Sequence, residues 1–588
     1  MFFSSFKKRK ERADANSSRE NNRRLCFFKY GVFVWTIVLI IRLFTLQIID
    51  HDYYSAEASG QRDIFAKIFP ERGDILLQDK NSQLYPLATN EDRFLVFADT
   101  RFVENKEKTA EILAELLEID IASVEERLNK ADDPFEPIKH DVLEIKMEEI
   151  KQANLPGINF TKESKRFYPL ANISSHLSGF VGEDETGKLM GRYGVEGSFD
   201  DDLRGKEGFL KGEKDVAGRY IPTGIEAMEN AQDGRDIILT IDRNIQYMAC
   251  EKLDEAVVKH GADGGSVIIM DPKTGRILAM CGAPDFDPNN FGKVKNSVVF
   301  NNPAIFNQYE PGSVFKVITM AAALDSGTVS PETTYEDIGK AQIGPHTITN
   351  SDNQAHGTQT MTQVLEKSLN TGAIFAAKKT GLEKFKDYVK RFGFGEQVKI
   401  DLETEAKGDL RSLDQKGDIY LATASFGQGI SVTPLQLIKA IGAIANGGKM
   451  MRPYVIDEKR EKDGRVIFEN SPQPVNQIVS SKTAALLSGM MTQVVENGHG
   501  KRAGVPGFFV AGKTGTAQIP SKDGLGYEAN TTIGSFVGFA PVDNPRFVMV
   551  VRIDRPRDVQ FAESSAAPLF GDIAQFLLQY LEVKPSRN

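Results

Sequence analysis

The longest apolar run divides the chain into two very unequal parts. It spans residues 27–49, and its strongly polar members are Lys29, Arg42 and Gln47. At about 1.5 Å per residue, a helix of this length can cross a bilayer. The alternative is a cleaved signal peptide, but the run exceeds the usual signal core of about 7–15 apolar residues. The sequence therefore predicts an uncleaved transmembrane helix.

The charges beside this run predict its orientation. Residues 1–29 carry nine Lys/Arg against three Asp/Glu, and positive flanks stay in the cytoplasm. We expect a basic cytoplasmic tail at residues 1–26 and a single-pass anchor in the cell (inner or cytoplasmic) membrane. The body of the protein should then be extracytoplasmic.

Composition excludes several classes of protein. The net charge is −9, so the part after residue 29 carries −15 and is a poor nucleic-acid binder. The seven histidines are scattered without an HExxH pattern, and three cysteines cannot build a four-cysteine zinc site. We expect no metal and no other cofactor. Of the cysteines only Cys250 and Cys281 could pair, and two separate buried thiols are favoured over a disulfide.

The body is long enough for more than one domain. Residues 50–235 alternate short strand-like runs with charged helical stretches, whereas residues 236–582 begin and end with strands and have helices between them. This order favours an α+β fold, with an antiparallel sheet packed against a helical subdomain. Residues 583–588 form a C-terminal tail. In the second region we expect a hairpin at 265–271 and 277–280, helices at 314–326, 360–380, 434–446, 481–496 and 567–582, and strands at 507–512, 532–540 and 546–553.

The first candidate for chemistry is the pair Ser313 and Lys316, at the start of a helical pattern. Positions i and i+3 share a face of a helix, so the amine can approach the hydroxyl. A serine needs an adjacent base to act as a nucleophile, and a lysine can serve if burial and a second cation lower its pKa.

A second candidate for chemistry is a serine motif 55 residues after Ser313. Ser368-Leu369-Asn370 is flanked by apolar residues that would hold it against a core. Its rival, Ser351-Asp352-Asn353, matches the pattern of class A β-lactamases but lies in a polar, turn-prone run. We favour Ser368 over Ser351.

The third motif is Lys513-Thr514-Gly515-Thr516. Residues 507–514 also fit the phosphate-loop pattern GxxxxGK[ST], but that loop requires a helix to begin at the lysine. Here the preceding residues are apolar and strand-like, and a strand along one wall of a site fits better. Lys513 would supply positive charge, both threonines would donate hydroxyls to a carboxylate, and Gly515 would let a substrate approach closely.

In this order and spacing, the three motifs resemble those of the penicillin-recognising serine acyltransferases. The chain is most similar to the class B penicillin-binding proteins, the D,D-transpeptidases of peptidoglycan synthesis. No glycosyltransferase domain fits between the anchor and the transpeptidase domain, which argues against class A. The further segments that carry the resemblance are 72–75, 166–169, 194–196 and 203–205 in the first region, and 239–242, 310–313, 426–429, 433–436 and 445–448 in the second.

The resemblance implies an elongated, mixed pedestal or dimerisation-like domain at residues 50–235. It also implies a penicillin-binding, β-lactamase-like transpeptidase domain at 236–582, with an antiparallel sheet flanked by helices and an all-helical subdomain. Segment 212–221 resembles division-type more than elongation-type members. The implied role is therefore stem-peptide cross-linking in septal wall synthesis, with the lateral wall as the alternative.

The resemblance also implies the chemical roles. Ser313 would attack the penultimate D-Ala of a stem peptide ending in D-Ala-D-Ala, Lys316 would take its proton, and Ser368 would relay protons between Lys316, Lys513 and the leaving amine. Asn370 would orient the substrate amide. The backbone N–H groups of Ser313 and Thr516 would form the oxyanion hole. β-Lactams would trap the same acyl-enzyme.

Two other classes of function are open from the sequence. A class D-type β-lactamase or β-lactam sensor shares the first and third motifs but needs no large N-terminal domain. A catalytically idle scaffold of the division machinery would not need the motif residues intact. The expected partners of the transpeptidase are a separate membrane glycan polymerase and other division proteins, with no nucleic acid.

Overall fold

The structure is a computed structural model. Most of the predicted anchor lies outside the residues that it describes, and within those residues no helix is long and apolar enough to cross a membrane. The chain forms two compact units, one of Met1–Pro70 with Lys206–Gln232 and one of Glu71–Gly205 with Asp233–Asn588. The described residues are 35–37, 39, 40, 44, 63–214, 220–521 and 526–587.

The first unit contains a three-stranded antiparallel sheet in the order β1-β8-β9. Its strands are β1 (Asp63–Ile68), β8 (Gly208–Lys214) and β9 (Tyr220–Glu229). Segment 212–221, on which the division-type expectation depends, includes residues 215–219, which lie outside the described part.

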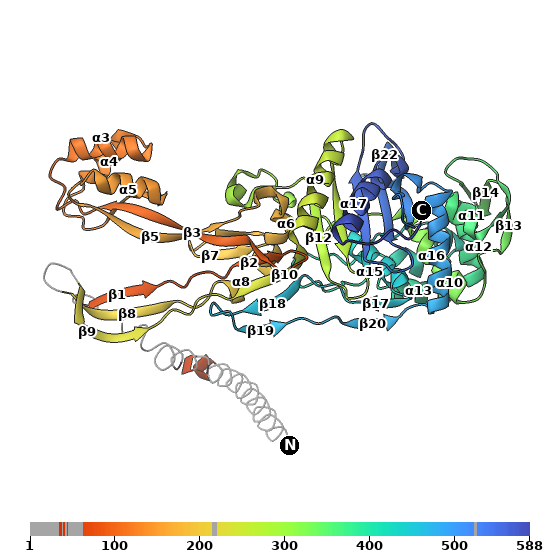
Figure 1. The fold of residues 1–588 in the computed structure, drawn as a ribbon, viewed down its shortest axis with the longest axis horizontal. Coiled ribbons are helices and arrows are strands. Elements are labelled where there is room, and N and C mark those ends of the chain that lie inside the picture. Colours follow the sequence, from red (N-terminus) through yellow and green to blue (C-terminus); the bar gives the residue numbers. More distant parts are fainter. Residues whose placement is uncertain are drawn as a thin grey trace, which may run out of the picture. The chain divides into compact units, whose positions relative to one another are not determined.

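One sheet of the second unit combines strands from distant parts of the sequence (Figure 1). Its order is β19-β18-β10-β2-β3-β4, with β5 also paired to β3. The central β10 pairs in parallel with β2 and antiparallel with β18. The strands are β2 (Ile75–Gln78), β3 (Leu84–Ala98), β4 (Glu136–Val142), β5 (Ile158–Phe167), β10 (Asp236–Asp242), β18 (Ile456–Arg460) and β19 (Val466–Glu469).

Three helices form a small core with β3 and β4. They are α3 (Lys106–Leu117), α4 (Ile121–Leu128) and α5 (Glu144–Gln152), and Leu113 and Val124 are fully buried in that core with Val96 of β3. Asn105 caps α3 by accepting the Lys108 N–H. Shorter elements follow: α6 (Ser175–Ser178), β6 (Phe180–Glu183), β7 (Leu189–Arg192), α7 (Gly194–Ser198) and α8 (Asp200–Leu203).

A buried ion network joins three segments that the sequence analysis singled out. The Glu196 carboxylate is inaccessible to solvent and pairs with Arg72 at 2.6 Å and Arg166 at 2.7 Å. Arg166 also donates to Asn90 at 3.2 Å. Because a buried charge is tolerated only when it is paired, these segments are fixed together by their charges.

The main sheet of the second unit has the order β12-β11-β23-β22-β21 and is antiparallel throughout. Every residue of β11 is buried, because helices cover both faces. Val267 packs with α9 and α17, whereas its neighbour Ile268 faces the core that contains α10 and α15. The elements are β11 (Gly264–Met270), β12 (Ile277–Ala283), β21 (Ala511–Pro520), β22 (Tyr527–Ala540), β23 (Phe547–Asp554), α9 (Arg243–Lys259), α10 (Lys316–Asp325), α15 (Pro434–Ala445), α16 (Ser481–Glu496) and α17 (Ala566–Tyr580).

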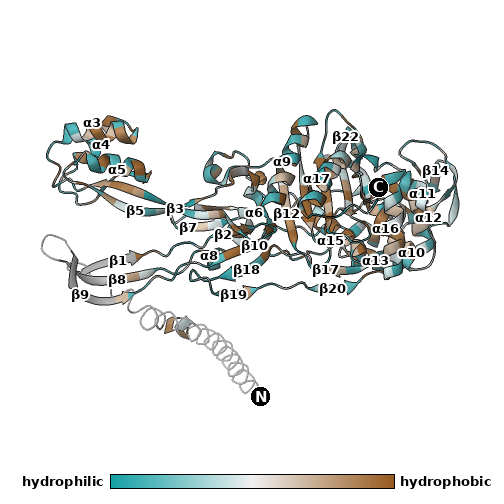
Figure 2. Ribbon diagram, in the orientation of Figure 1, coloured by the Kyte–Doolittle hydropathy of each residue, from teal (hydrophilic) through white to brown (hydrophobic). Residues whose placement is uncertain are grey.

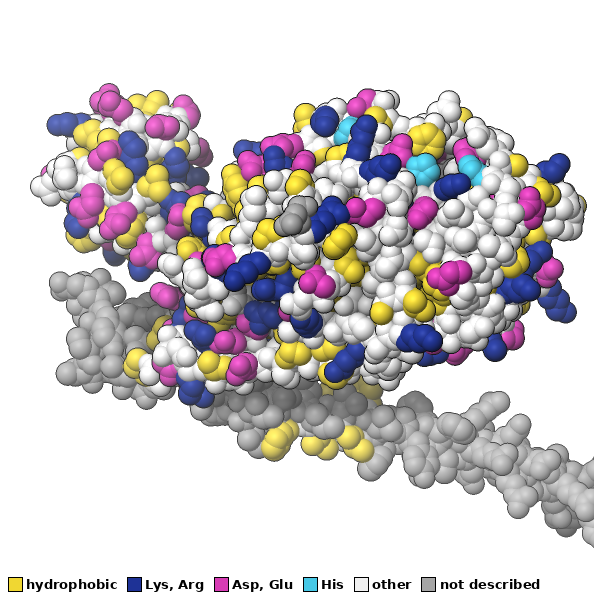
Figure 3. Space-filling view, turned by 45° about the vertical axis from the view of Figure 1, so that its right-hand side comes forward, with side chains coloured by type: hydrophobic (Ala, Val, Ile, Leu, Met, Phe, Trp, Pro, Cys, Tyr) yellow, Lys and Arg dark blue, Asp and Glu magenta, His cyan; other side chains and the backbone are white. Residues whose placement is uncertain are grey.

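The α+β expectation is confirmed at the level of this sheet with its covering helices. Figure 2 shows hydrophobic residues concentrated on β12, α15 and α17, and Figure 3 shows charges of both signs interspersed over the face in view. The helical part also contains short two-stranded ribbons, so it is not purely helical. Its elements are α11 (Met361–Glu366), α12 (Asn370–Thr380), α13 (Leu382–Arg391), α14 (Asp418–Ala424), β13 (Thr334–Asp337), β14 (Lys340–Ile343), β15 (His346–Thr349) and β16 (Gly357–Thr360), while β17 (Lys449–Met451) pairs with β20 (Pro474–Gln477).

Two expected elements differ from the structure. The helix expected at 360–380 is divided into α11 and α12 at Ser368, whose φ of 56° lies in the left-handed region. The strand expected at 507–512 begins only at Ala511 and continues to Pro520, so the lysine motif lies inside it. This extended backbone also excludes the phosphate-loop alternative, because no helix begins at Lys513.

The expectation of two separate thiols is wrong. Cys250 on α9 and Cys281 on β12 form a disulfide, with Cα atoms 5.2 Å apart. The packing of α9 against β12 brings the two residues within disulfide distance.

Candidate functional site

Ser313 lies in a tight turn at the start of a buried helix. The 3₁₀ turn Gly312–Phe315 leads directly into α10, in which all residues but the last are buried. Gly312 has φ 56° and its N–H donates to the Gly427 carbonyl at 3.1 Å. A side chain on Gly427 would come within 2.2 Å of the Gly312 oxygen. The turn is therefore held by close backbone packing, while the Ser313 side chain stays half-buried.

Lys316 is almost fully buried, with 1% of its surface exposed. Its ammonium nitrogen donates to the Ser368 carbonyl at 2.5 Å and to Asn370 Oδ1 at 2.8 Å, and lies 3.3 Å from Ser368 Oγ. Burial, reinforced by the charge of Lys513, holds the pKa of Lys316 well below its usual value. A lysine in this environment can act as a base near neutral pH.

Ser368 connects the two lysines. Lys513 Nζ donates to Ser368 Oγ at 2.9 Å, and the same oxygen faces Lys316. The left-handed backbone of Ser368 places its hydroxyl between the two amines, at the junction of α11 and α12. The geometry thus unites residues from α10, β21 and this junction in one buried network.

The third motif lies along β21, which is the last strand of its sheet. Lys513 is fully buried, and burial lowers its pKa to about 7. A side chain on Gly515 would lie 2.8 Å from Val314 Cγ1, so this glycine is needed for the strand to pack against the Ser313 turn. Thr514 Oγ1 lies 3.3 Å from Lys513 Nζ, and Thr516 Oγ1 accepts the Ala562 N–H at 3.1 Å.

The rival motif lies apart from this network. Ser351 is exposed in a turn, and Asp352 pairs with His356 at 2.8 Å. The nearby Asn370 reaches this loop only through its amide, which donates to the Thr349 carbonyl at 2.9 Å. Among the described hydrogen bonds, none joins Ser351 to Lys316 or Lys513.

One residue beside the nucleophile was not predicted as a site residue. The carboxylate of Glu310 accepts the Gly429 N–H at 2.9 Å and the Tyr527 hydroxyl at 3.1 Å. The signal in the sequence was its position three residues before Ser313. Nothing in the sequence indicated the contacts with two distant segments.

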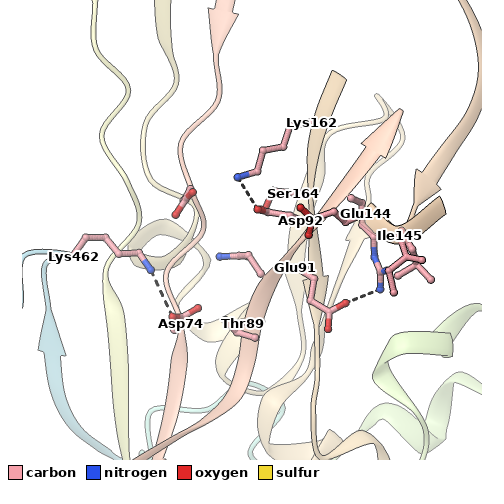
Figure 4. Close-up of a pocket in the computed structure, with 13 residues that line it drawn as sticks. Asp74, Thr89, Glu91, Asp92, Glu144, Ile145, Lys162, Ser164 and Lys462 are labelled. Carbon is pink, nitrogen blue, oxygen red and sulfur yellow. Dashed lines mark hydrogen bonds and ion pairs between the residues drawn. The ribbon is translucent and has the colours of Figure 1, made fainter. Parts of the chain in front are cut away.

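A separate cavity of about 620 Å³ lies in the N-terminal part of the second unit (Figure 4). It is lined mainly by charged residues around β2, β3 and β5, and none of the three motifs contributes to it. Its charges are largely paired, as between Lys162 and Asp92 at 2.8 Å. We therefore place the candidate active site at Ser313 and not at this cavity.

Two family models match the chain. The penicillin binding protein transpeptidase domain matches residues 265–575, and the penicillin-binding protein dimerisation domain matches residues 67–239. The first range includes all three motifs.

Curated relatives match over nearly the whole chain. Stage V sporulation protein D of Bacillus subtilis is 36% identical over 572 residues, which cover 96% of this chain and 87% of that protein. The peptidoglycan D,D-transpeptidase FtsI homolog of Mesostigma viride is 28% identical over 599 residues, covering 96% and 98% respectively.

Solved structures share the architecture. Penicillin binding protein 3 of Mycobacterium tuberculosis, in complex with aztreonam, aligns with a TM-score of 0.67 at 27% identity, covering 89% of this chain and 98% of that chain. Penicillin binding protein 2X of Streptococcus thermophilus aligns with a TM-score of 0.76 at 24% identity, covering 89% and 81%, and supports the fold alone.

Proposed function

The chain belongs to the class B penicillin-binding proteins, which makes it a serine-type peptidoglycan D,D-transpeptidase, and we propose that Ser313, Lys316 and Ser368 carry out its chemistry. The observation that carries the proposal is the buried network in which Ser368 Oγ lies between the amines of Lys316 and Lys513. Proton transfer among three groups requires such contact.

In the acylation half-reaction, neutral Lys316 removes the Ser313 proton as Oγ attacks the carbonyl of the penultimate D-Ala. The peptide bond to the terminal D-Ala breaks, and the leaving nitrogen takes a proton through Ser368. The backbone N–H groups of Ser313 and Thr516 stabilise the oxyanion, at about 3 kcal/mol per donor. The products are an ester at Ser313 and free D-Ala.

In the transfer half-reaction, an amine of a neighbouring stem peptide attacks this ester. The amine loses a proton to the same network, the ester bond breaks, and Ser313 regains its proton. The new amide is the cross-link. A β-lactam opens by the first half-reaction, and its ester at Ser313 blocks the site.

The substrate is oriented by the third motif and Asn370. Protonated Lys513 with the Thr514 and Thr516 hydroxyls binds the terminal carboxylate. The Asn370 amide orients the substrate backbone, and its Oδ1 also accepts from Lys316 at 2.8 Å. Binding and proton transfer are therefore coupled through shared side chains.

The cellular setting follows from the sequence. Residues 27–49 anchor the chain in the cell membrane with residues 1–26 in the cytoplasm, and the catalytic part acts on the outer side. Septal wall synthesis is the favoured role, in company with a separate glycan polymerase and other division proteins.

Labelling with a fluorescent penicillin tests the chemical proposal. The wild-type chain should form a stable adduct, and Ser313→Ala should form none while keeping its thermal unfolding temperature, because one half-buried hydroxyl is removed. Rapid turnover of the adduct would indicate a β-lactamase, and absence of an adduct in the wild type would indicate a scaffold. Stoichiometric labelling of Ser313→Ala would overturn the nucleophile assignment.

A further inference from the structure

Glu310 lies three residues before Ser313, and none of the ion pairs among the described residues includes it. Its carboxylate is half-buried and is held by the Gly429 N–H and the Tyr527 hydroxyl. Among the described residues, the groups that act on this carboxylate are that N–H and that hydroxyl, and no cation is among them. Burial raises the pKa of Glu310 above its usual value. Desolvating a carboxylate without a cation is costly, so this position is prepared for a positively charged ligand.

Three neighbours place Glu310 beside the outer half of β21. Gln428 Nε2 donates to Gln518 Oε1 at 3.1 Å, which joins the loop that contacts Glu310 to this strand. Tyr527 pairs with Pro520 at the far end of β21. We call Glu310, Gln428, Gln518 and Tyr527 the acidic subsite. It lies on the Gln518 side of the Ser313 turn.

The order of groups along β21 then fixes which part of a substrate reaches this subsite, and this step rests on the proposed function. The terminal carboxylate lies at Lys513 and Thr514, and the reacting carbonyl lies between the N–H groups of Ser313 and Thr516. The rest of the stem peptide must continue toward Gln518. Because β21 is an edge strand, an extended peptide can pair along it at about 3.3 Å per residue.

We propose that Glu310 binds the side-chain ammonium of the third residue of the donor stem peptide, the residue that precedes the acylated D-Ala. Glu310 is then a specificity-determining residue. It selects stem peptides whose third residue carries a free amine over peptides whose third residue is neutral.

The test compares two pentapeptides ending in D-Ala-D-Ala, one with a free lysine and one with N-acetyl-lysine at the third position. Release of D-Ala by the full chain is measured without an acceptor amine. The wild type should prefer the free amine by about tenfold or more in kcat/KM, because the Glu310 carboxylate has no positive charge to pair with when the acetylated peptide is bound. Glu310→Gln should bring this ratio close to one, and Glu332→Gln, which changes an exposed carboxylate elsewhere, should preserve it.

The outcomes separate this inference from the proposed function. Equal efficiency of the two peptides on the wild-type chain overturns the assignment, whether or not Glu310→Gln folds. An unchanged ratio of the two peptides' kcat/KM values in folded Glu310→Gln also overturns it. If Glu310→Gln instead changed only the partition of the acyl-enzyme between hydrolysis and transfer to an added amine, the Glu310 carboxylate would belong to the acceptor site. Failure of the wild type to form a penicillin adduct would contradict the proposed function itself.

Discussion

Two buried lysines on either side of one serine hydroxyl set the pH dependence expected of this site. Lys316 must be neutral to accept the Ser313 proton, and its pKa is lowered by burial and by Lys513. Lys513 must be protonated to bind a carboxylate, and its pKa is about 7. The first requirement disfavours low pH and the second disfavours high pH.

We therefore expect a bell-shaped profile for the rate constant of acylation by benzylpenicillin. The rate should rise on the acid side as Lys316 loses its proton and fall above about pH 7 as Lys513 loses its own. Lys513→Gln should abolish the falling limb and move the rising limb to higher pH, because removal of a like charge raises the pKa of Lys316. A flat wild-type profile from pH 5 to 10 would contradict this coupling.

The two serine motifs can be separated by substitution. Ser368→Ala should slow acylation by about 10²-fold or more, because it removes the hydroxyl that joins both lysines. Ser351→Ala should stay within a few-fold of wild type, because Ser351 is exposed in a turn. Stopped-flow acylation of both variants measures the difference, and the opposite ranking would make Ser351 the functional residue.

At this scale the sequence indicated the residues but not their contacts. The spacing of Ser313 and Lys316 suggested a direct contact, whereas the described hydrogen bonds of Lys316 go to Ser368 and Asn370. The left-handed φ of Ser368 could not be predicted, because an apolar helical pattern continues on both sides of it. Glu310 was missed because its partners are more than one hundred residues away.

At the scale of elements, periodicity predicted α15 and α16 well. Both begin at a side-chain cap, Thr433 and Ser480 respectively. In α16 buried and exposed positions alternate, whereas α15 is buried on almost all sides. The start of β21 was misplaced because the apolar residues before it are buried in a core but do not pair in the sheet. Composition alone does not separate apolar residues of this kind from those of a paired strand.

We expect the disulfide between α9 and β12 to contribute measurably to the protein's stability against unfolding. Closing a loop of about 30 residues is worth roughly 3.7 kcal/mol in the chain-entropy account, and the two cysteines are 31 positions apart. Cys250→Ala with Cys281→Ala should lower the thermal unfolding temperature by about 5 °C. The unfolding temperature of this variant should also become insensitive to a reducing agent.

The matched control is Cys26→Ala, which leaves the pair intact. It should unfold at the wild-type temperature and keep the sensitivity to reduction. If reduction had no effect on the wild-type chain, the disulfide would contribute nothing to its stability.

At the scale of the whole molecule, the two matched family domains share one sheet. The strand β10 belongs to the dimerisation match at residues 67–239 in all but its last three residues, yet it pairs with β18 from within the transpeptidase match. The sequence pattern indicated two regions that differ in composition. It could not indicate that they exchange strands, because pairings between residues more than two hundred positions apart leave no local pattern. The boundary at 235 and 236 stays a prediction.

Because of this shared sheet, we expect the transpeptidase part to depend on the N-terminal strands for its stability. A chain of residues 243–588 lacks β2 and β10, so β18 keeps only β19 as a neighbour and exposes an unpaired edge. We expect it to unfold at a lower temperature than residues 63–588 and to aggregate more, as measured by differential scanning fluorimetry and light scattering. Equal behaviour of the two chains would show that β10 adds no stability to the catalytic part.

The main sheet has a consequence for the order in which the protein can be made. Its middle strand, β23, comes from residues near the end of the chain, while its neighbour β11 is synthesised almost three hundred residues earlier. During synthesis, β11 and β12 emerge as a hairpin whose third partner does not yet exist. The wall along which the substrate would bind can close only after β23 has been made, so we expect an incomplete chain not to be acylated by penicillin.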